Sequence, residues 1–278
     1  MSVTRFPSAY TIPVDYPVSS APRYGLKVGV HERMKALLDA DRSKYESILK
    51  AMADRTDLLA GIPATEDGTN RPFWTNPWFP SLDATALMHF ILERKPGKFI
   101  EIGSGTSTMF ARHAITHGGL STKILSIDPQ PRRGIDQICD RVVRSPLEDV
   151  DQAIFDTLVE GDILFFDGSH RVFSDSDVTV FFLEILPRIP AGVLIHIHDI
   201  FWPKDYPESW GNRYYSEQYM LAMLFLYAPE AYEIVFPNAY VSDDPAMRQI
   251  VSGMTPGEPV YGYYGVSFWF QKAGISPR

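Results

Sequence analysis

Short apolar runs alternate with segments of helical hydrophobic periodicity through most of the chain. The runs are typical of parallel strands that are buried on both faces, because they are apolar at nearly every position instead of at every second one. Strands that alternate with helices predict a doubly wound α/β sheet. We expect a mostly parallel sheet of seven strands, at 98–102, 123–128, 141–145, 161–167, 192–199, 232–236 and 265–271. Helices are expected at 81–94, 107–117, 148–158, 174–186 and 215–227.

The first 80 residues have a different pattern. Prolines and tyrosines dominate residues 1–27, which favours an extended conformation, and apolar residues recur at helical spacing from about 30 to 60. This spacing predicts one long or two short amphipathic helices. We therefore expect an N-terminal extension over 1–80 and an α/β domain over 81–278. The apolar face of these helices must be buried, either against the rest of the chain or against a second copy in a homo-oligomer.

Composition and charge restrict the partners. The chain has 278 residues, 45% of them hydrophobic, which is enough for one large core. The net charge of −8 and the absence of a basic block disfavour nucleic acid and anionic membranes. Cys139 is the only cysteine, the N-terminus has no signal pattern, and no apolar stretch reaches spanning length. We expect a cytoplasmic protein that acts on a small molecule.

A glycine-rich turn follows the strand at 98–102. Gly103 and Gly105 allow a positive φ and a close approach of the backbone to a ligand, and the helix that begins after them points amide groups at that ligand. Asp128 ends the next strand, where nucleotide-binding folds place the carboxylate that binds ribose. Thr108 stands where a dinucleotide site has its third glycine. The pattern favours an adenosine-bearing ligand other than NAD.

The order acid, apolar residue, Gly-x-Gly at 101–105 resembles the first motif of class I S-adenosyl-L-methionine-dependent methyltransferases, and the resemblance covers about residues 81–271. It implies a Rossmann-like methyltransferase fold with S-adenosyl-L-methionine as cofactor. Glu101, Gly103 and Gly105 would surround its methionine part, and Asp128 would accept both ribose hydroxyls. The expected cofactor-binding set is Glu101, Gly103, Ser104, Gly105, Thr106, Ser107, Asp128, Leu147 and Asp167.

Polar residues crowd the ends of two later strands. Asp167-Gly168-Ser169-His170 follows one strand, and His196-Ile197-His198-Asp199 ends the next. Ligands bind outside the carboxyl ends of the strands in open α/β sheets, so we expect Asp167, His170 and Asp199 to converge as candidate catalytic residues. If the strand persists, its alternation places His198 and Asp199 on opposite faces.

Three hypotheses compete for these residues. The pattern resembles the methyltransferase branch typified by macrocin O-methyltransferase, which implies that Asp167 and Asp199 hold Mg²⁺ or another divalent cation, although Ile200 stands where the catechol-type site has a further oxygen ligand. Alternatively, His170 or His198 is a metal-free general base with a near-normal pKa. A structural role is the third hypothesis, and it is the one we favour for His196.

We therefore predict an O-methyltransferase for a small hydroxylated metabolite. Two alternatives remain open: a metal-dependent, non-methylating enzyme resembling cephalosporin hydroxylase, and a non-catalytic nucleoside-binding subunit of an oligomer. A zinc or iron site at His196-x-His198-Asp199 is a weaker alternative, because it leaves the glycine turn and Asp128 unexplained. The aromatic loop at 61–80 either floors a substrate pocket or packs the N-terminal helices, and the loop at 201–214 either forms a lid or packs on itself.

Overall fold

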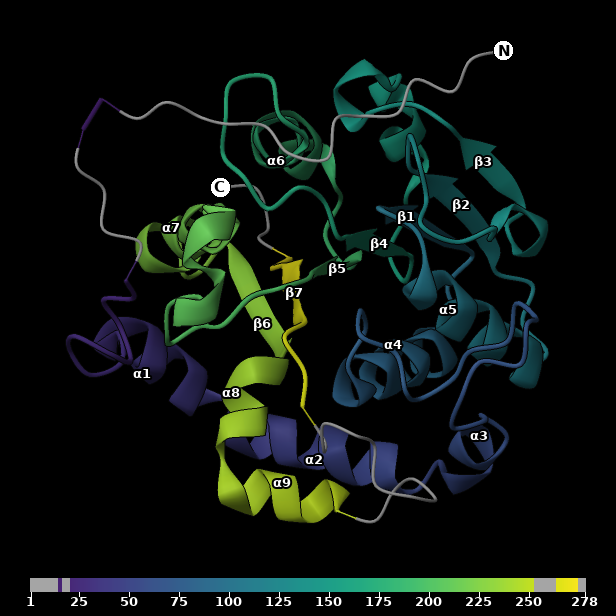
Figure 1. Cartoon of the computed structure of the whole chain (residues 1–278), viewed down its shortest axis with the longest axis horizontal. Coiled ribbons are helices and arrows are strands. Elements are labelled where there is room, and N and C mark those ends of the chain that lie inside the picture. The colour runs from purple at the N-terminus through teal and green to yellow at the C-terminus, as the bar shows by residue number, and fades with distance from the viewer. Residues whose placement is uncertain (1–14, 17–20, 253–263, 275–278) are drawn as a thin grey trace.

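The computed structural model describes residues 15–16, 21–252 and 264–274. A seven-stranded sheet runs through the molecule in the order β3-β2-β1-β4-β5-β7-β6 (Figure 1). The strands are β1 (Lys98–Ile102), β2 (Lys123–Ile127), β3 (Arg141–Val143), β4 (Ile163–Phe166), β5 (Leu194–Ile197), β6 (Tyr232–Pro237) and β7 (Phe268–Lys272). This is the Rossmann-like methyltransferase fold, and the predicted fold class is confirmed.

One strand of the sheet is reversed. β7 pairs antiparallel with β5 on one side and with β6 on the other, so β6 runs in the same direction as the five parallel strands. Residues 245–251 form a helix within the long connection from β6 to β7. β6 and β7 therefore form an antiparallel pair at the edge of the sheet, with the last strand inserted between β5 and β6.

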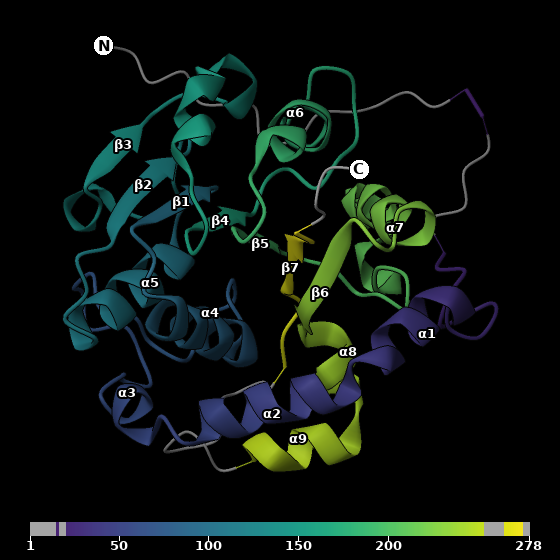
Figure 2. The ribbon, with the colours of Figure 1, turned by 180° about the vertical axis from the view of Figure 1, so that it is seen from behind.

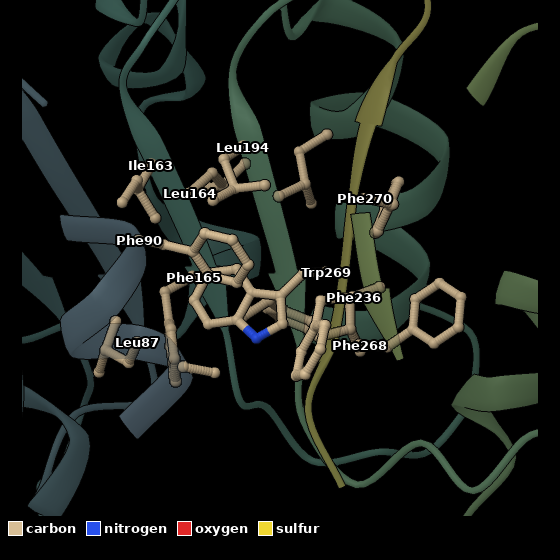
Figure 3. Packing of buried hydrophobic residues seen from close by; sticks show 14 of the residues in the cluster. Leu87, Phe90, Ile163, Leu164, Phe165, Leu194, Phe236, Phe268, Trp269 and Phe270 are labelled. Carbon is tan, nitrogen blue, oxygen red and sulfur yellow. The ribbon is translucent and has the colours of Figure 1, made fainter. Parts of the chain in front are cut away.

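Helices cover both faces of the sheet (Figures 1 and 2). Phe90 of α4 (Ser81–Arg94) packs on Trp269 of β7 with ring centroids 4.8 Å apart. On the other face, Phe181 stacks on Phe166 of β4 at 4.2 Å. Trp269 is completely buried, and Figure 3 shows it among aromatic and aliphatic side chains of α4, β4, β5 and β6. The principal helices are α4 (Ser81–Arg94), α5 (Thr106–His117), α6 (Asp177–Val180) and α7 (Glu217–Tyr227).

The N-terminal helices belong to the same hydrophobic core as the sheet. They are α1 (Glu32–Ala40), α2 (Arg42–Ala53) and α3 (Thr56–Ala60), one more than expected. Met34, Leu38 and Leu49 are fully buried in the cluster that contains the strand residues. α2 lies against α8 (Asn238–Asp243) and α9 (Pro245–Val251) in both views (Figures 1 and 2). Most of the segment 1–27, expected to be extended, lies outside the described residues.

Two expected helices are interrupted. The segment 174–186 contains only the short α6, which continues as a π-helical turn over 181–185 and a 3₁₀ turn over 186–188. Pro187 lacks an N–H and cannot continue a regular helix. The segment 148–158 is two 3₁₀ turns, because the Asp151 side chain accepts a hydrogen bond from Ala153 N and starts a second turn. α4 begins at Ser81 itself, preceded by Pro80.

Candidate functional site

A cavity of about 720 Å³ opens at the carboxyl ends of β1 to β5. Its volume is within the usual range for small-molecule sites, about 300–1,000 Å³. The turn 103–107, here called the glycine turn, and Asp128 form one side of the lining. Four side chains, here called the aspartate cluster, line the same cavity: Asp167, His170, His198 and Asp199. The fold thus brings both predicted sets into one space.

Gly103 permits the close approach of two strand ends. Its φ is +78°, and a Cβ atom at this position would lie 1.8 Å from the backbone oxygen of Asp167. No other residue fits there without moving the backbone. Gly105 has a φ of 173°, which is extended, so the expected positive φ is absent at that position. Its N–H donates to Thr108 Oγ1 at 3.0 Å, so the residue that replaces a third glycine caps α5 instead.

Asp128 is held by two backbone N–H groups. Its Oδ2 accepts from Ser104 N at 2.8 Å and its Oδ1 accepts from Gln130 N at 2.7 Å. Each carboxylate oxygen can accept a further hydrogen bond, so both remain available to a ligand. Leu147 is buried and lines the same cavity, where it offers an apolar surface.

Glu101 lies beneath the glycine turn and does not line the cavity. Its carboxyl group accepts hydrogen bonds from Ser107 Oγ at 2.6 Å and Thr108 Oγ1 at 2.5 Å. Burial raises the pKa of Glu101 to about 8. The expectation that Glu101 contacts the ligand is corrected, since its side chain supports the first turn of α5 from below.

The aspartate cluster is compact. His170 Nε2 lies 3.2 Å from Asp167 Oδ1 and 3.4 Å from Asp199 Oδ2. His198 Nδ1 lies 3.4 Å from Asp199 Oδ1 and 3.7 Å from Asp167 Oδ1. Each aspartate therefore faces two imidazole rings, and the three candidate catalytic residues converge together with His198.

Backbone conformation explains why His198 and Asp199 meet. β5 ends at Ile197, so the alternation of faces does not extend to the next two residues. Asp199 has a φ of +57° and His170 a φ of +61°, a region that non-glycine residues rarely adopt. The expectation that His198 and Asp199 point apart was wrong, because the positive φ turns Asp199 toward its neighbour.

Two buried carboxylates from distant helices complete the arrangement. His170 Nδ1 lies 2.9 Å from Glu217 Oε2, 47 residues away, and His198 Nε2 lies 3.2 Å from Asp83 Oδ2, 115 residues away. Both acids are fully buried. Asp83 also accepts from the backbone N–H groups of Val266 and Ser267, each at 2.9 Å. Sequence reasoning missed both acids; the only signal was a single acid in the first turn of an apolar helix.

Charge pairing sets the protonation of the cluster. Burial alone would lower the pKa values of His170 and His198, but the surrounding carboxylates raise them well above normal. Burial opposes ionisation of Asp167, yet the neighbouring imidazolium groups hold its pKa well below its usual range. For Asp199, burial is the larger effect and its pKa is raised. The surrounding carboxylates therefore favour the imidazolium form of both rings.

The histidines lie behind the aspartates. All four ring nitrogens of His170 and His198 face carboxylate oxygens, and the two side chains are only 6% and 5% exposed. The Asp167 and Asp199 side chains are 29% and 12% exposed. The groups that a ligand meets first are therefore carboxylates.

His196 is part of the sheet core. It is fully buried, its Nε2 lies 2.7 Å from Ser267 Oγ, and its ring stacks on Phe165 at 3.7 Å. Burial lowers its pKa well below normal, so the ring is neutral. His196 does not line the cavity, and these contacts match the structural role that we favoured.

The loops at 61–80 and 201–214 each place some aromatic side chains in the core and others in the lining of the cavity. In the first loop, Phe73 and Trp74 are buried in the core, whereas Trp78 and Phe79 line the cavity. In the second loop, Trp202 is buried and donates from Nε1 to Gln218 O at 2.7 Å. Trp210, Arg213 and Tyr215 line the cavity.

The expected divalent cation is not supported. Within the described part of the chain, no group of three or more His, Cys, Asp or Glu side chains is arranged to hold a metal ion. The carboxylates of Asp167 and Asp199 face imidazole nitrogens, whereas Mg²⁺ requires several oxygen ligands. The donor set therefore does not fit the expected ion.

None of the described helices is long and apolar enough to cross a membrane.

Comparison with known proteins identifies the central region. Residues 100–200 match a family model described as a methyltransferase domain. An uncharacterized protein from Archaeoglobus fulgidus is 36% identical over 135 residues, which are 45% of this chain and 60% of that protein. The chain thus spans about three fifths of the length of this relative.

Solved structures with similar topology are distant. The SAH-bound methyltransferase PaMTH1 of Podospora anserina is 15% identical, with 68% of this chain and 77% of that chain covered and a TM-score of 0.42. An O-methyltransferase from Bacillus cereus in complex with SAH is also 15% identical, with 87% and 96% covered and a TM-score of 0.42. A branched-chain polyamine synthase from Thermus thermophilus is 11% identical, with 81% and 65% covered and a TM-score of 0.40.

Proposed function

We propose that the chain is a class I S-adenosyl-L-methionine-dependent methyltransferase that methylates a hydroxyl oxygen of a small metabolite. The observation that carries this proposal is the single cavity in which the glycine turn and Asp128 face the same space as Asp167 and Asp199. All of these residues lie within 100–200, the segment that matches the methyltransferase domain. The cavity volume and the net charge of −8 favour a small molecule over nucleic acid.

The glycine-turn side has the groups that an adenosine-bearing cofactor requires. The turn opens α5, so its amide groups point toward a ligand above β1. Asp128 retains acceptor capacity for two ribose hydroxyls, and Leu147 offers an apolar face to the base. When bound, S-adenosyl-L-methionine supplies the electrophilic methyl group. The glycine turn, Asp128 and Leu147 would hold it beside the acceptor, and such positioning can be worth about 7–11 kcal/mol.

The aspartate cluster has the groups that an acceptor hydroxyl requires. As the new C–O bond forms and the methyl–sulfur bond breaks, the hydroxyl proton must leave. Asp199 is the proposed base, because its carboxylate borders the cavity and its pKa is raised, whereas that of Asp167 is lowered. His170 and His198 are positioning residues, since both nitrogens of each ring are engaged. This assignment replaces His170 as the base.

Calorimetry tests the cofactor assignment directly. S-adenosylmethionine and S-adenosylhomocysteine should bind, and NAD should not. Asp128→Ala should weaken binding by about 1–3 kcal/mol through lost hydrogen bonds. Asp156→Asn is the matched control, because Asp156 pairs with Arg188 outside the cavity. If Asp128→Ala bound the cofactor as tightly as the wild type, Asp128 would not belong to the site. Binding of NAD but of neither cofactor form would refute the proposal.

Turnover separates the proposal from its alternatives. Methyl transfer to a hydroxylated compound that persists with a chelator would match the proposed chemistry. Loss of activity with the chelator, or oxygen-dependent hydroxylation, would favour the metal-dependent alternative. Cofactor binding with no transfer to any member of a hydroxylated library would favour the nucleoside-binding subunit.

A further inference from the structure

Two arginines border the cavity beside the aspartate cluster. Arg171 directly follows His170 after β4, and Arg213 lies at the end of the 3₁₀ turn Glu208–Arg213 in the loop after β5. Both line the cavity, although they come from separate loops. No sequence pattern singled out Arg171, and Arg213 lies in the loop at 201–214 that was expected to form a lid or to pack on itself.

Neither arginine has a carboxylate partner within the described residues. Arg171 donates from Nε to Arg213 O and from Nη1 to Ser169 O, both at 2.9 Å, and these carbonyls leave its charge uncompensated. Many other arginines of this acidic chain are ion-paired; Arg42, for example, lies 2.6 Å from Asp244 and Arg112 lies 2.7 Å from Asp140. An unpaired guanidinium pair at a cavity wall is suited to a ligand oxyanion.

Aromatic rings hold the two guanidinium groups without neutralising them. Arg171 and Arg213 lie 5.1 Å and 5.6 Å from the centroid of the Tyr215 ring, and Arg213 lies 3.9 Å from that of Trp210. The Tyr215 ring also packs on the ring of His170, with centroids 4.5 Å apart. Tyr215 therefore joins the arginine pair to the aspartate cluster. A ligand that reaches from the two arginines to Asp199 can present an anion to the arginines and a hydroxyl to Asp199.

We propose that the methyl acceptor carries an oxyanion, a carboxylate or a phosphate, which Arg171 and Arg213 bind. This inference rests on the proposed function and names the chemical class of its substrate. The carboxylates of Asp167 and Asp199, which a ligand meets before the histidines, offer an anion no hydrogen-bond donor at the reacting end, while the arginines attract it to the opposite end. The arginines thus fix which end of the acceptor faces the methyl group. Trp210 and Tyr215 favour an acceptor with a flat ring beside the anion.

Matched probes test the proposal. We would titrate 3-hydroxybenzoate, 3-hydroxyphenyl phosphate and the neutral 3-hydroxybenzamide into the full chain, with and without S-adenosylhomocysteine. At least one anionic probe should bind about tenfold or more tightly than the amide, and added salt should reduce this preference. The better anion distinguishes a carboxylate from a phosphate acceptor. Equal affinity of all three probes would overturn the inference.

Variants assign the preference to the two arginines. The Arg171→Gln and Arg213→Gln double variant should lose the preference and bind the amide as the wild type does. Arg248→Gln also removes a positive charge, from α9 outside the cavity, and should keep the preference. An undiminished preference in the double variant would refute the role of both arginines.

S-adenosylhomocysteine also carries a carboxylate, so its affinity identifies the source of the anion. Unchanged affinity in the double variant assigns the arginines to the acceptor, and a tenfold or larger loss would assign them to the cofactor and overturn the inference. If neither cofactor form binds the wild type while the anion preference persists, the proposed function fails and the anion site remains. If the cofactor binds without any anion preference, only this inference fails.

Discussion

The glycine turn and the aspartate cluster border one cavity but are built in different ways. The glycine turn is held by neighbours in the sequence, such as the hydrogen bonds from Ser107 and Thr108 to Glu101, six and seven residues away. The aspartate cluster depends on acids that are 47 and 115 residues away. Local contacts fix a backbone shape for binding, whereas long-range ion pairs fix charges for chemistry. The two sides should therefore respond differently to substitution.

The largest difference between the effect on turnover and the effect on cofactor binding is expected for the Asp199→Asn variant. The amide cannot accept the hydroxyl proton, so turnover should fall by about 10²- to 10⁴-fold. Binding of S-adenosylhomocysteine should change by less than about twofold, well below one hydrogen bond. Steady-state kinetics and calorimetry on the same preparation measure both quantities. A parallel loss of affinity would show that the two sides are not separate.

Asp83→Asn should be the most destabilising substitution in the supports of the cluster. The Asp83 carboxylate faces His198 and accepts backbone hydrogen bonds from Val266 and Ser267, and the substitution removes its charge. Breaking a buried pair typically costs about 3–5 kcal/mol, and urea unfolding measures this loss. Asp156→Asn, at an exposed pair with Arg188, is the control and should cost at most about 1 kcal/mol. Equal costs would contradict the long-range role of Asp83.

The same difference explains what the sequence could predict. The glycine turn was recognisable because its strand, glycines and helix are contiguous, and Asp128 follows at the next strand end. Asp83 and Glu217 were not recognisable, because a single acid in an apolar helix does not reveal which distant ring it will meet. The direction of Asp199 depended on a positive φ, which the alternation of a strand could not indicate. The interruption of the segment 174–186 is different, because Pro187, which cannot continue a regular helix, directly follows it and is visible in the sequence.

Alkaline pH should weaken the aspartate cluster. Burial would lower the pKa of His198, but Asp199 and Asp167 raise it well above 6.5 in the folded state. The stabilisation by the imidazolium is complete below the unfolded pKa and is lost as pH rises through the folded pKa. The loss is about 1.4 kcal/mol for each pH unit between the two values. Melting temperatures above pH 6.5 should fall more steeply for the wild type than for His198→Gln, and parallel curves would refute the pairing.

The smallest effect is expected beneath the glycine turn, in Glu101→Gln. Because burial raises the pKa of Glu101 to about 8, its carboxyl group is protonated at neutral pH and offers one donor and one acceptor, as an amide does. The variant should lose less than about 1 kcal/mol of unfolding free energy at neutral pH, the scale of one net hydrogen bond. Glu101→Ala should lose more, since it leaves the buried hydroxyls of Ser107 and Thr108 without this partner.

The sign of the pH dependence sharpens this test. The unfolded chain loses the Glu101 proton near pH 4.5, whereas the folded chain keeps it up to about pH 8. Wild-type stability should therefore fall relative to that of Glu101→Gln as pH rises through this window, the same direction as the loss expected from His198 but at lower pH. Denaturant titrations of both proteins across the window measure the difference. A Gln variant as unstable as the Ala variant would mean that the glycine turn, like the aspartate cluster, relies on a buried charge.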